Sequence, residues 1–256
     1  MKSNKIIGKL LAERHSLWLS VGLHLFPGVL IVAVYFLVAP LIHNLGIPPF
    51  LGWIVAMCIA LVPTELGLIL WLGKQRNGKF SMEGIVHFLD KPTSNKKNVL
   101  FIIPLIIWFL TISVALLPLD KLIYKAFFEW VPFEGAGGNL DSVLIGYSHK
   151  AKIISLAVCI PLSGLLLPVV EELYFRGFLM PRIPISGLRK PILSSIFFSI
   201  YHFWTPWGVI SRVVYLLPTF IFVWIKKDLR ISMYVHAGTN FIMQTIGTLA
   251  LIFNFI

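Results

Sequence analysis

Long runs of apolar residues constrain the fold of this chain more than any other feature. A helix that crosses the hydrocarbon core of a bilayer needs about 20 mainly apolar residues. The chain has 256 residues, of which 57% are hydrophobic and 13% charged, so it is far more apolar than a soluble domain of this size. The sequence therefore predicts an all-α, polytopic membrane helix bundle with about seven transmembrane helices. The predicted spans are 17–41, 47–73, 99–119, 153–170, 191–210, 207–225 and 231–256.

Basic residues lie mainly on one side of this predicted bundle. If seven spans alternate in direction, most of the 22 Lys and Arg residues fall on one side, in segments 2–14, 74–97, 176–190 and 226–230. The other side has Lys121, Lys125, Lys150, Lys152 and Arg212. Because cytoplasmic loops carry an excess of Lys and Arg, we expect a cytoplasmic N-terminus. Attraction to membrane lipids with anionic headgroups accounts for the net charge of +11, so no nucleic-acid partner is expected.

The distribution of polar residues divides the chain into three predicted parts. Residues 1–120 contain three transmembrane spans and a basic cytoplasmic loop, with few polar residues inside the spans. Residues 121–152 form an external loop, in which the Gly and Pro of EWVPFEGAGGNLDS favour irregular structure. Residues 153–256 carry most of the ionisable side chains within predicted spans. Such side chains are costly in a bilayer and mark function by default, so this part is the candidate catalytic helical core.

The stretch VVEELYFRGF places two carboxylates and a cation after an apolar run. Glu172 and Arg176 are four residues apart, so on a helix they share a face and can form an ion pair. That pair could equally anchor the helix end at the cytoplasmic interface or serve a functional site. Glu171 points about 100° away from Glu172 on a helix and has no cation nearby in sequence. Its lack of a local partner favours a functional role.

Two further stretches, SSIFFSIYHF and YVHAGTNF, place polar side chains in later spans. His202 follows Phe198 by four residues near the middle of the fifth predicted span. Asn240 follows His236 by four residues on one face of the last span. Each side chain alone could form a hydrogen bond between helices. If the three stretches converge, a carboxylate, two imidazoles and an amide would form a reaction centre.

These stretches resemble the three motifs of one family of membrane proteins. EELYFR matches the EExxxR motif of the CPBP family, FSIYH matches its FxxxH motif, and HAGTN matches its HxxxN motif. The family, also called Abi proteins, is related to the type II CAAX prenyl endopeptidase. The three motifs occur in the family's order, on separate hydrophobic segments within about residues 150–245. The resemblance implies an all-helical intramembrane peptidase.

The resemblance also implies a role for each motif residue. Hydrolysis of a peptide bond needs a base for the water, a proton donor for the leaving amine and stabilisation of the oxyanion. Glu171 would be the general base, and His202 would hold or polarise the water. His236 and Asn240 would position the carbonyl and donate hydrogen bonds to the oxyanion. Glu172 and Arg176 would orient the catalytic groups.

The cofactor requirement has two interpretations within this family, a zinc metallopeptidase and a metal-free glutamate peptidase. The sequence has no HExxH pair on one helix, but Glu171, His202 and His236 could form an open three-ligand zinc site. We favour the metal-free mechanism and no cofactor. With only two imidazoles in the motif region, Glu171 would otherwise have to be a ligand rather than the base.

The sequence thus predicts an intramembrane endopeptidase that uses activated water to cleave a hydrophobic peptide or protein substrate, either prenylated or otherwise membrane-bound. The protein is predicted to be a multi-pass protein of a cell membrane. The short chain favours a bacterial inner or plasma membrane. Two other classes remain open: a non-catalytic membrane binding or immunity protein, and an ion-coupled transporter. We see no internal repeat in the chain, which makes the transporter less favoured.

Overall fold

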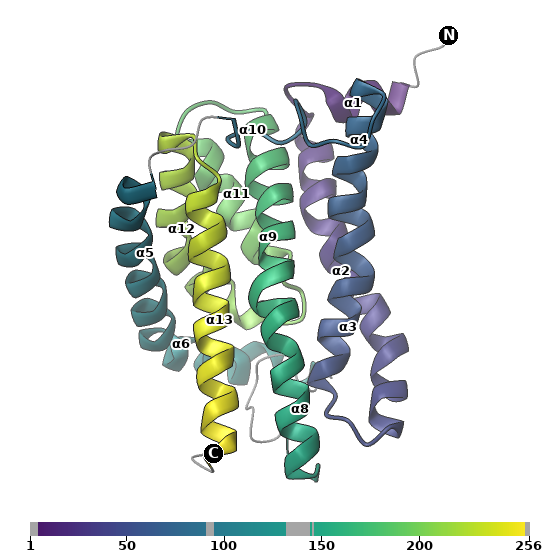
Figure 1. The fold of residues 1–256 in the computed structure, drawn as a ribbon, viewed down its shortest axis with the longest axis vertical. Coiled ribbons are helices and arrows are strands. Elements are labelled where there is room, and N and C mark those ends of the chain that lie inside the picture. Colours follow the sequence, from purple (N-terminus) through teal and green to yellow (C-terminus); the bar gives the residue numbers. More distant parts are fainter. Residues whose placement is uncertain (1–4, 91–94, 132–143, 145, 254–256) are drawn as a thin grey trace.

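A computed structural model describes residues 5–90, 95–131, 144 and 146–253. These residues form helices and connecting turns without strands, which confirms the predicted all-α class. Figure 1 shows the long helices running along one axis as a bundle. The first half comprises α1 (Lys5–Leu11), α2 (Leu17–Asn44), α3 (Phe50–Leu61), the π-helical η1 (Val62–Gly67), α4 (Leu68–Asn77), α5 (Asn95–Ala115), α6 (Leu117–Ile123) and η2 (Tyr124–Phe128).

The second half begins with one long helix that consists of several segments. The elements are α8 (His149–Cys159), η3 (Ile160–Leu166), α9 (Leu167–Glu171), η4 (Glu172–Leu179), α10 (Met180–Arg182), α11 (Arg189–Ile200), η5 (Pro206–Gly208), α12 (Val209–Lys226) and α13 (Arg230–Ile252). Five described helices are long and apolar enough to cross a membrane: Leu17–Asn44, Phe50–Asn77, Asn98–Ala115, His149–Arg182 and Pro206–Lys226. Together with α13, which also runs along the bundle (Figure 1), they make a multi-pass membrane protein.

Local sequence signals set several of these helix ends. The Ser16 hydroxyl accepts a hydrogen bond from the backbone N–H of Leu19 and caps α2, and Ser148 caps α8 through Ala151 in the same way. Gly78 ends α4 in the left-handed conformation, at φ 75°, where glycine has no steric penalty. The start and end of a long apolar helix are therefore marked by ordinary capping residues.

The fourth span is longer than the predicted 153–170 and continues to Arg182. Glu172 and Arg176 lie inside this helix with no solvent exposure, so of the two alternatives left open for this pair the structure does not support the anchor at the interface. A membrane span usually ends where charged side chains are exposed to water. Here Glu172 and Arg176 pair within the protein, and the helix continues past them.

The fifth span differs most from the prediction. The expected helix over 191–210 ends at Ile200, and the chain turns back through 201–205 to η5 and α12. A helix of 12 residues is about 18 Å long, too short for a hydrocarbon core of about 30 Å. Pro206 keeps Thr205 out of the helical conformation, because the residue before proline avoids it, and Thr205 has φ −139° and ψ 58°. His202 thus lies in a turn beyond the helix rather than in mid-helix.

Helix α2 fits closely against this turn. A Cβ atom on Gly28 would lie 1.9 Å from the carbonyl oxygen of Tyr201, so only glycine allows this approach. Irregular backbone at membrane depth is tolerated where it is buried in protein or lines a cavity. The turn meets that condition because α2 covers one side of it.

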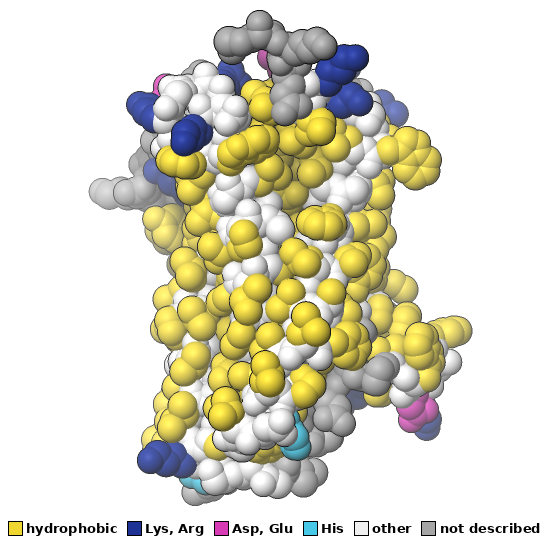
Figure 2. Space-filling model, turned by 90° about the vertical axis from the view of Figure 1, so that its right-hand side faces the viewer, with side chains coloured by type: hydrophobic (Ala, Val, Ile, Leu, Met, Phe, Trp, Pro, Cys, Tyr) yellow, Lys and Arg dark blue, Asp and Glu magenta, His cyan; other side chains and the backbone are white. Residues whose placement is uncertain are grey.

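The two ends of the bundle differ in charge. Helix α1, the end of α4, α10 and the end of α12 lie at one end, and α13 finishes at the other (Figure 1). Figure 2 shows Lys and Arg side chains gathered at the α1 end, above a flank covered with apolar side chains. The cytoplasmic assignment of the basic end stays a prediction. Residues 132–143 and 145 of the predicted external loop 121–152 lie outside the described residues.

Candidate active site

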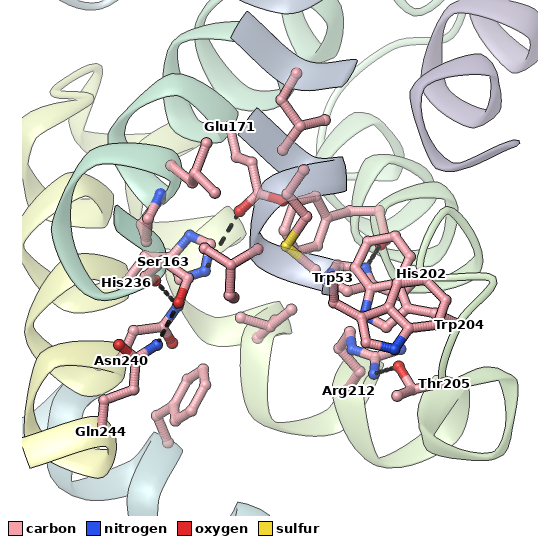
Figure 3. A pocket seen from close by; sticks show the side chains of 18 of the residues that line it. Trp53, Ser163, Glu171, His202, Trp204, Thr205, Arg212, His236, Asn240 and Gln244 are labelled. Carbon is pink, nitrogen blue, oxygen red and sulfur yellow. Dashed lines mark hydrogen bonds and ion pairs between the residues drawn. The ribbon is translucent and has the colours of Figure 1, made fainter. Parts of the chain in front are cut away.

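A cavity of about 390 Å³ lies where the two halves of the bundle meet. All four predicted catalytic side chains, Glu171, His202, His236 and Asn240, line it. They come from α9, the turn after α11, and α13, and Figure 3 shows them around one space. Residues that are distant in sequence therefore converge, as a reaction centre requires. Other lining residues are Phe50, Trp53, Ile54, Met57, Leu61, Phe109, Ser163, Thr205, Arg212, Tyr215 and Gln244.

Glu171 is the last residue of α9, and its side chain is held from two sides. The hydroxyl of Tyr201 donates a hydrogen bond to its Oε1 atom. Its Oε2 atom lies 3.8 Å from Nε2 of His236. Glu171 is 7% exposed in total, so it borders the cavity while remaining largely enclosed. One carboxyl oxygen is thus fixed by Tyr201, and the other lies on the side of the cavity where His236 stands.

His236 connects Glu171 to a buried ion pair. Its Nδ1 atom lies 2.9 Å from Oε1 of Glu172, and Arg176 donates to the same oxygen. The predicted pairing of Glu172 with Arg176 is confirmed. Because a carboxylate accepts hydrogen bonds, this contact places a proton on Nδ1 and directs Nε2 toward Glu171. The guanidinium of Arg176 also lies 3.7 Å from the centre of the Phe220 ring, so the pair is enclosed by aromatic packing.

Asn240 lies one helical turn beyond His236 and is tied to the π-helical segment η3. Its amide nitrogen donates to the carbonyl oxygen of Ser163 at 3.1 Å. Gln244 donates to the hydroxyl of the same serine at 2.8 Å. A carboxamide nitrogen carries two N–H donors, so the bond to Ser163 orients Asn240 and leaves a second donor for a ligand.

His202 stands on the opposite side of the cavity, beside Trp204, Thr205 and Arg212 (Figure 3). Its Nδ1 atom lies 2.7 Å from the carbonyl oxygen of Phe198. Because a carbonyl oxygen only accepts, Nδ1 carries the proton and Nε2 is the acceptor in the neutral ring. His202 is therefore suited to accept a hydrogen bond from water.

The zinc alternative does not fit this arrangement. Among the described residues, no three His, Cys, Asp or Glu side chains gather closely enough to hold a metal ion. Glu171 and His236 adjoin, but His202 lies across the cavity from them (Figure 3). We therefore derive no catalytic step through a metal.

Sequence reasoning missed three features of this site. Tyr201 precedes the motif histidine directly, but nothing in the pattern indicates its contact with Glu171. Arg212 was visible as a cation that interrupts an apolar span, without a role. Glu65 was visible as the only acidic residue in its span. It is fully buried, and neither of its carboxyl oxygens has a hydrogen-bond partner among the described residues.

Comparison with known protein families bears on the second half of the chain. Residues 153–242 match the family model described as type II CAAX prenyl endopeptidase Rce1-like. The match includes all three motifs and confirms the family resemblance for this segment. No curated protein and no solved structure matches the chain significantly. Over residues 153–242 the chain is thus similar to the Rce1-like family of CAAX prenyl endopeptidases.

Proposed function

We propose that the Rce1-like segment is the core of an intramembrane endopeptidase in which Glu171 activates the attacking water. One observation carries the proposal: Glu171, His236 and Asn240 meet at a cavity inside an apolar helix bundle. The family match supports a CAAX-type protease, and the mechanism below is our inference from the geometry. The same geometry favours a mechanism that uses no cofactor.

The reaction consumes one water molecule, and Glu171 ends it in the same protonation state in which it began. Glu171 takes a proton from the water as its oxygen attacks the carbonyl carbon of the scissile bond, and the carbonyl electron pair moves onto oxygen. The free N–H of Asn240 donates to this oxyanion, as does Nε2–H of His236 when both ring nitrogens carry protons. His202 accepts a hydrogen bond from cavity water through Nε2 on the opposite side. The tetrahedral intermediate then collapses, the C–N bond breaks, and Glu171 gives the proton to the leaving amine.

Three groups act by positioning the others. Tyr201 holds one oxygen of Glu171, so the other is directed to the water. Glu172 fixes the ring of His236 through Nδ1, and Arg176 fixes Glu172. Hydrolytic groups held within a low-dielectric site need little reorganisation during the reaction.

The cavity wall indicates the class of substrate. Trp53, Ile54, Met57 and Phe109 face the cavity from the first half of the chain, and they suit a hydrophobic peptide that is bound to the membrane, prenylated or not. A multi-pass protein with this site would act on substrates that reach it from the bilayer or from the basic end. We place it in a cell membrane, with the bacterial membrane as the favoured setting.

The test is cleavage of a library of hydrophobic peptides by the purified protein in lipid nanodiscs. Glu171→Gln keeps the shape of the side chain and removes the base, so we expect cleavage to fall by about 10³-fold. Glu83→Gln makes the same change at an exposed position and should leave cleavage unchanged. Each sample is repeated with a metal chelator, and wild-type activity should persist.

Other outcomes would replace the proposal. Activity that is lost on chelation and restored by zinc would make Glu171 and the histidines metal ligands. Full activity of Glu171→Gln would remove the residue from the mechanism. Peptide binding without cleavage in the wild type would favour the non-catalytic binding protein.

A further inference from the structure

A second cavity, of about 410 Å³, lies at the outside of the bundle, between α1, α2, η1 and α4. Its lining includes Leu10, Phe26 and Trp71, and the buried Tyr174 of η4 forms its floor. Phe26 is 57% exposed and Trp71 is 37% exposed, so the cavity is a groove that opens to the surroundings. No residue of this groove also lines the cavity at Glu171. The groove is therefore a separate site.

The hydroxyl groups in the groove already donate to the protein itself. Thr64 donates to the carbonyl oxygen of Ala60 at 2.6 Å, and Tyr174 donates to the carbonyl oxygen of Leu23 at 2.8 Å. A peptide in the groove would find few partners for its backbone N–H and C=O groups, which is costly at a site that faces lipid. A hydrocarbon chain has no such groups. The lining therefore favours a hydrocarbon occupant over a peptide.

The length of the groove matches one leaflet of a bilayer. Along η1 and α4 its lining runs from Pro63 to Trp71, and Lys74 lies one helical turn beyond Trp71. A helical rise of about 16 Å separates Pro63 from Lys74. Half of a hydrocarbon core of about 30 Å is about 15 Å. A chain that starts at the level of Lys74 thus reaches the middle of the bilayer along this groove.

Lysines stand where the groove meets the basic end of the bundle. Lys9 lies in the last turn of α1 and Lys74 in the last turn of α4, and these two helices contact each other. Both lysines are exposed, and neither belongs to an ion pair within 4.0 Å among the described residues. Figure 2 looks onto the side where α1, α2 and α4 lie, with basic side chains above an apolar surface. Basic side chains at this level attract anionic headgroups.

We propose that this groove binds one acyl chain of an anionic phospholipid, with the phosphate of the headgroup beside Lys9 and Lys74. The chain packs along α4 and against Tyr174, which lies three residues after Glu171 on the same long helix. The bound lipid therefore supports the helix that carries Glu171 without entering the cavity. The inference does not depend on the proposed function, because it concerns binding and needs no hydrolysis.

Native mass spectrometry of the purified protein in detergent tests the headgroup. The protein is titrated with dioleoyl phosphatidylglycerol or with the phosphatidylcholine that has the same chains. We expect the wild type to bind one phosphatidylglycerol at least about 10-fold more tightly, since two lysines attract its charge. Lys9→Gln with Lys74→Gln should remove this preference. The same double change at Lys121 and Lys125, on α6 and η2 at the other end of the bundle (Figure 1), is the matched control and should keep it.

A substitution that fills the groove tests the place of binding. Gly67 lines the groove, and a Cβ atom there would meet the carbonyl oxygen of Val62 at an ordinary 3.4 Å. Gly67→Leu should therefore fold and bind both lipids at least about 10-fold more weakly. Gly247→Leu, where a Cβ has nothing within 4 Å, is the matched control and should bind them as the wild type does. Trp71→Ala removes part of the exposed wall and should weaken both lipids about 5-fold, so it decides the matter if Gly67→Leu unfolds.

Three results would overturn the inference. Equal affinity of the wild type for the two lipids would remove the anionic headgroup from it. Unchanged binding by Trp71→Ala and by folded Gly67→Leu would place the lipid elsewhere on the protein. Displacement of the lipid by an equimolar hydrophobic peptide would assign the groove to a peptide. Glu171→Gln should bind phosphatidylglycerol as the wild type does, so the fate of the peptidase proposal does not decide this one.

Discussion

The two halves of the described chain contribute different things to the same cavity. From residues 5–131 the lining side chains are apolar: Phe50, Trp53, Ile54, Met57, Leu61 and Phe109. From residues 146–253 come all of its charged side chains, Glu171 and Arg212, together with His236 and Asn240. The charged groups of the cavity and its apolar wall therefore come from different halves of the chain. Under the proposed function, the Rce1-like segment carries the reactive groups, and the preceding helices give the space for a substrate.

The halves also differ in how they treat a buried carboxyl. Glu172 in the second half is paired with Arg176 and bonded to His236. Glu65 in the first half is equally buried and has no hydrogen-bond partner among the described residues. Removing a buried carboxyl that has partners leaves those partners unsatisfied and lowers the free energy of unfolding. A buried carboxyl without partners itself lowers the free energy of unfolding. Substitutions at Glu172 and Glu65 test this contrast between carboxyls, and a substitution at Trp53 tests the role of the apolar half.

The largest effect is expected at Glu172. Glu172→Gln leaves Arg176 charged, buried and without its counterion, so the free energy of unfolding should fall by about 4 kcal/mol. Thermal unfolding of the purified protein in detergent measures this. The double variant Glu172→Met with Arg176→Met removes both charges and should recover most of the loss. It should still hydrolyse peptides poorly, because His236 has lost the acceptor for Nδ1. A stable Glu172→Gln variant would contradict the importance of the pair.

A somewhat smaller effect is expected at the apolar wall. Trp53 is 3% exposed and stacks on Tyr35 with ring centroids 3.6 Å apart. Trp53→Ala should lower the free energy of unfolding by about 3 kcal/mol through the cavity it leaves. Under the proposed function it should also raise KM and preserve kcat, since the wall would bind substrate without taking part in the chemistry. Trp18→Ala, at a side chain that is 84% exposed, is the control. A loss of kcat in Trp53→Ala would show that the wall also positions the reacting groups.

The smallest effect is expected at Glu65. Glu65→Met replaces an unpaired carboxyl with an apolar side chain of similar length, so the free energy of unfolding should rise by about 1 kcal/mol. The same unfolding measurement detects this change. A clear destabilisation would mean that Glu65 has a partner in the folded protein, and the contrast between the halves would then disappear.

Sequence patterns could predict much of this arrangement, and particular residues show where they stop. The apolar runs predict the long helices, and the spacing of Glu172 and Arg176 predicts their pairing, because both depend on local periodicity. The end of α11 at Ile200 was missed because the residues that follow it are mostly as apolar as a helix in a membrane. The contact of Tyr201 with Glu171 and the wall at Trp53 depend on packing between distant segments. No local pattern encodes those contacts.

The order of the helices along the chain has a consequence for biogenesis. His236 and Asn240 lie on α13, the last described helix, and a membrane protein is synthesised and folded from its N-terminus. The apolar wall can assemble while the last helix is still inside the ribosome, but the set of polar groups cannot. A nascent copy therefore passes through the insertion machinery before its own cavity is complete. Under the proposed function, the growing chain would stay inert until α13 has entered the bilayer.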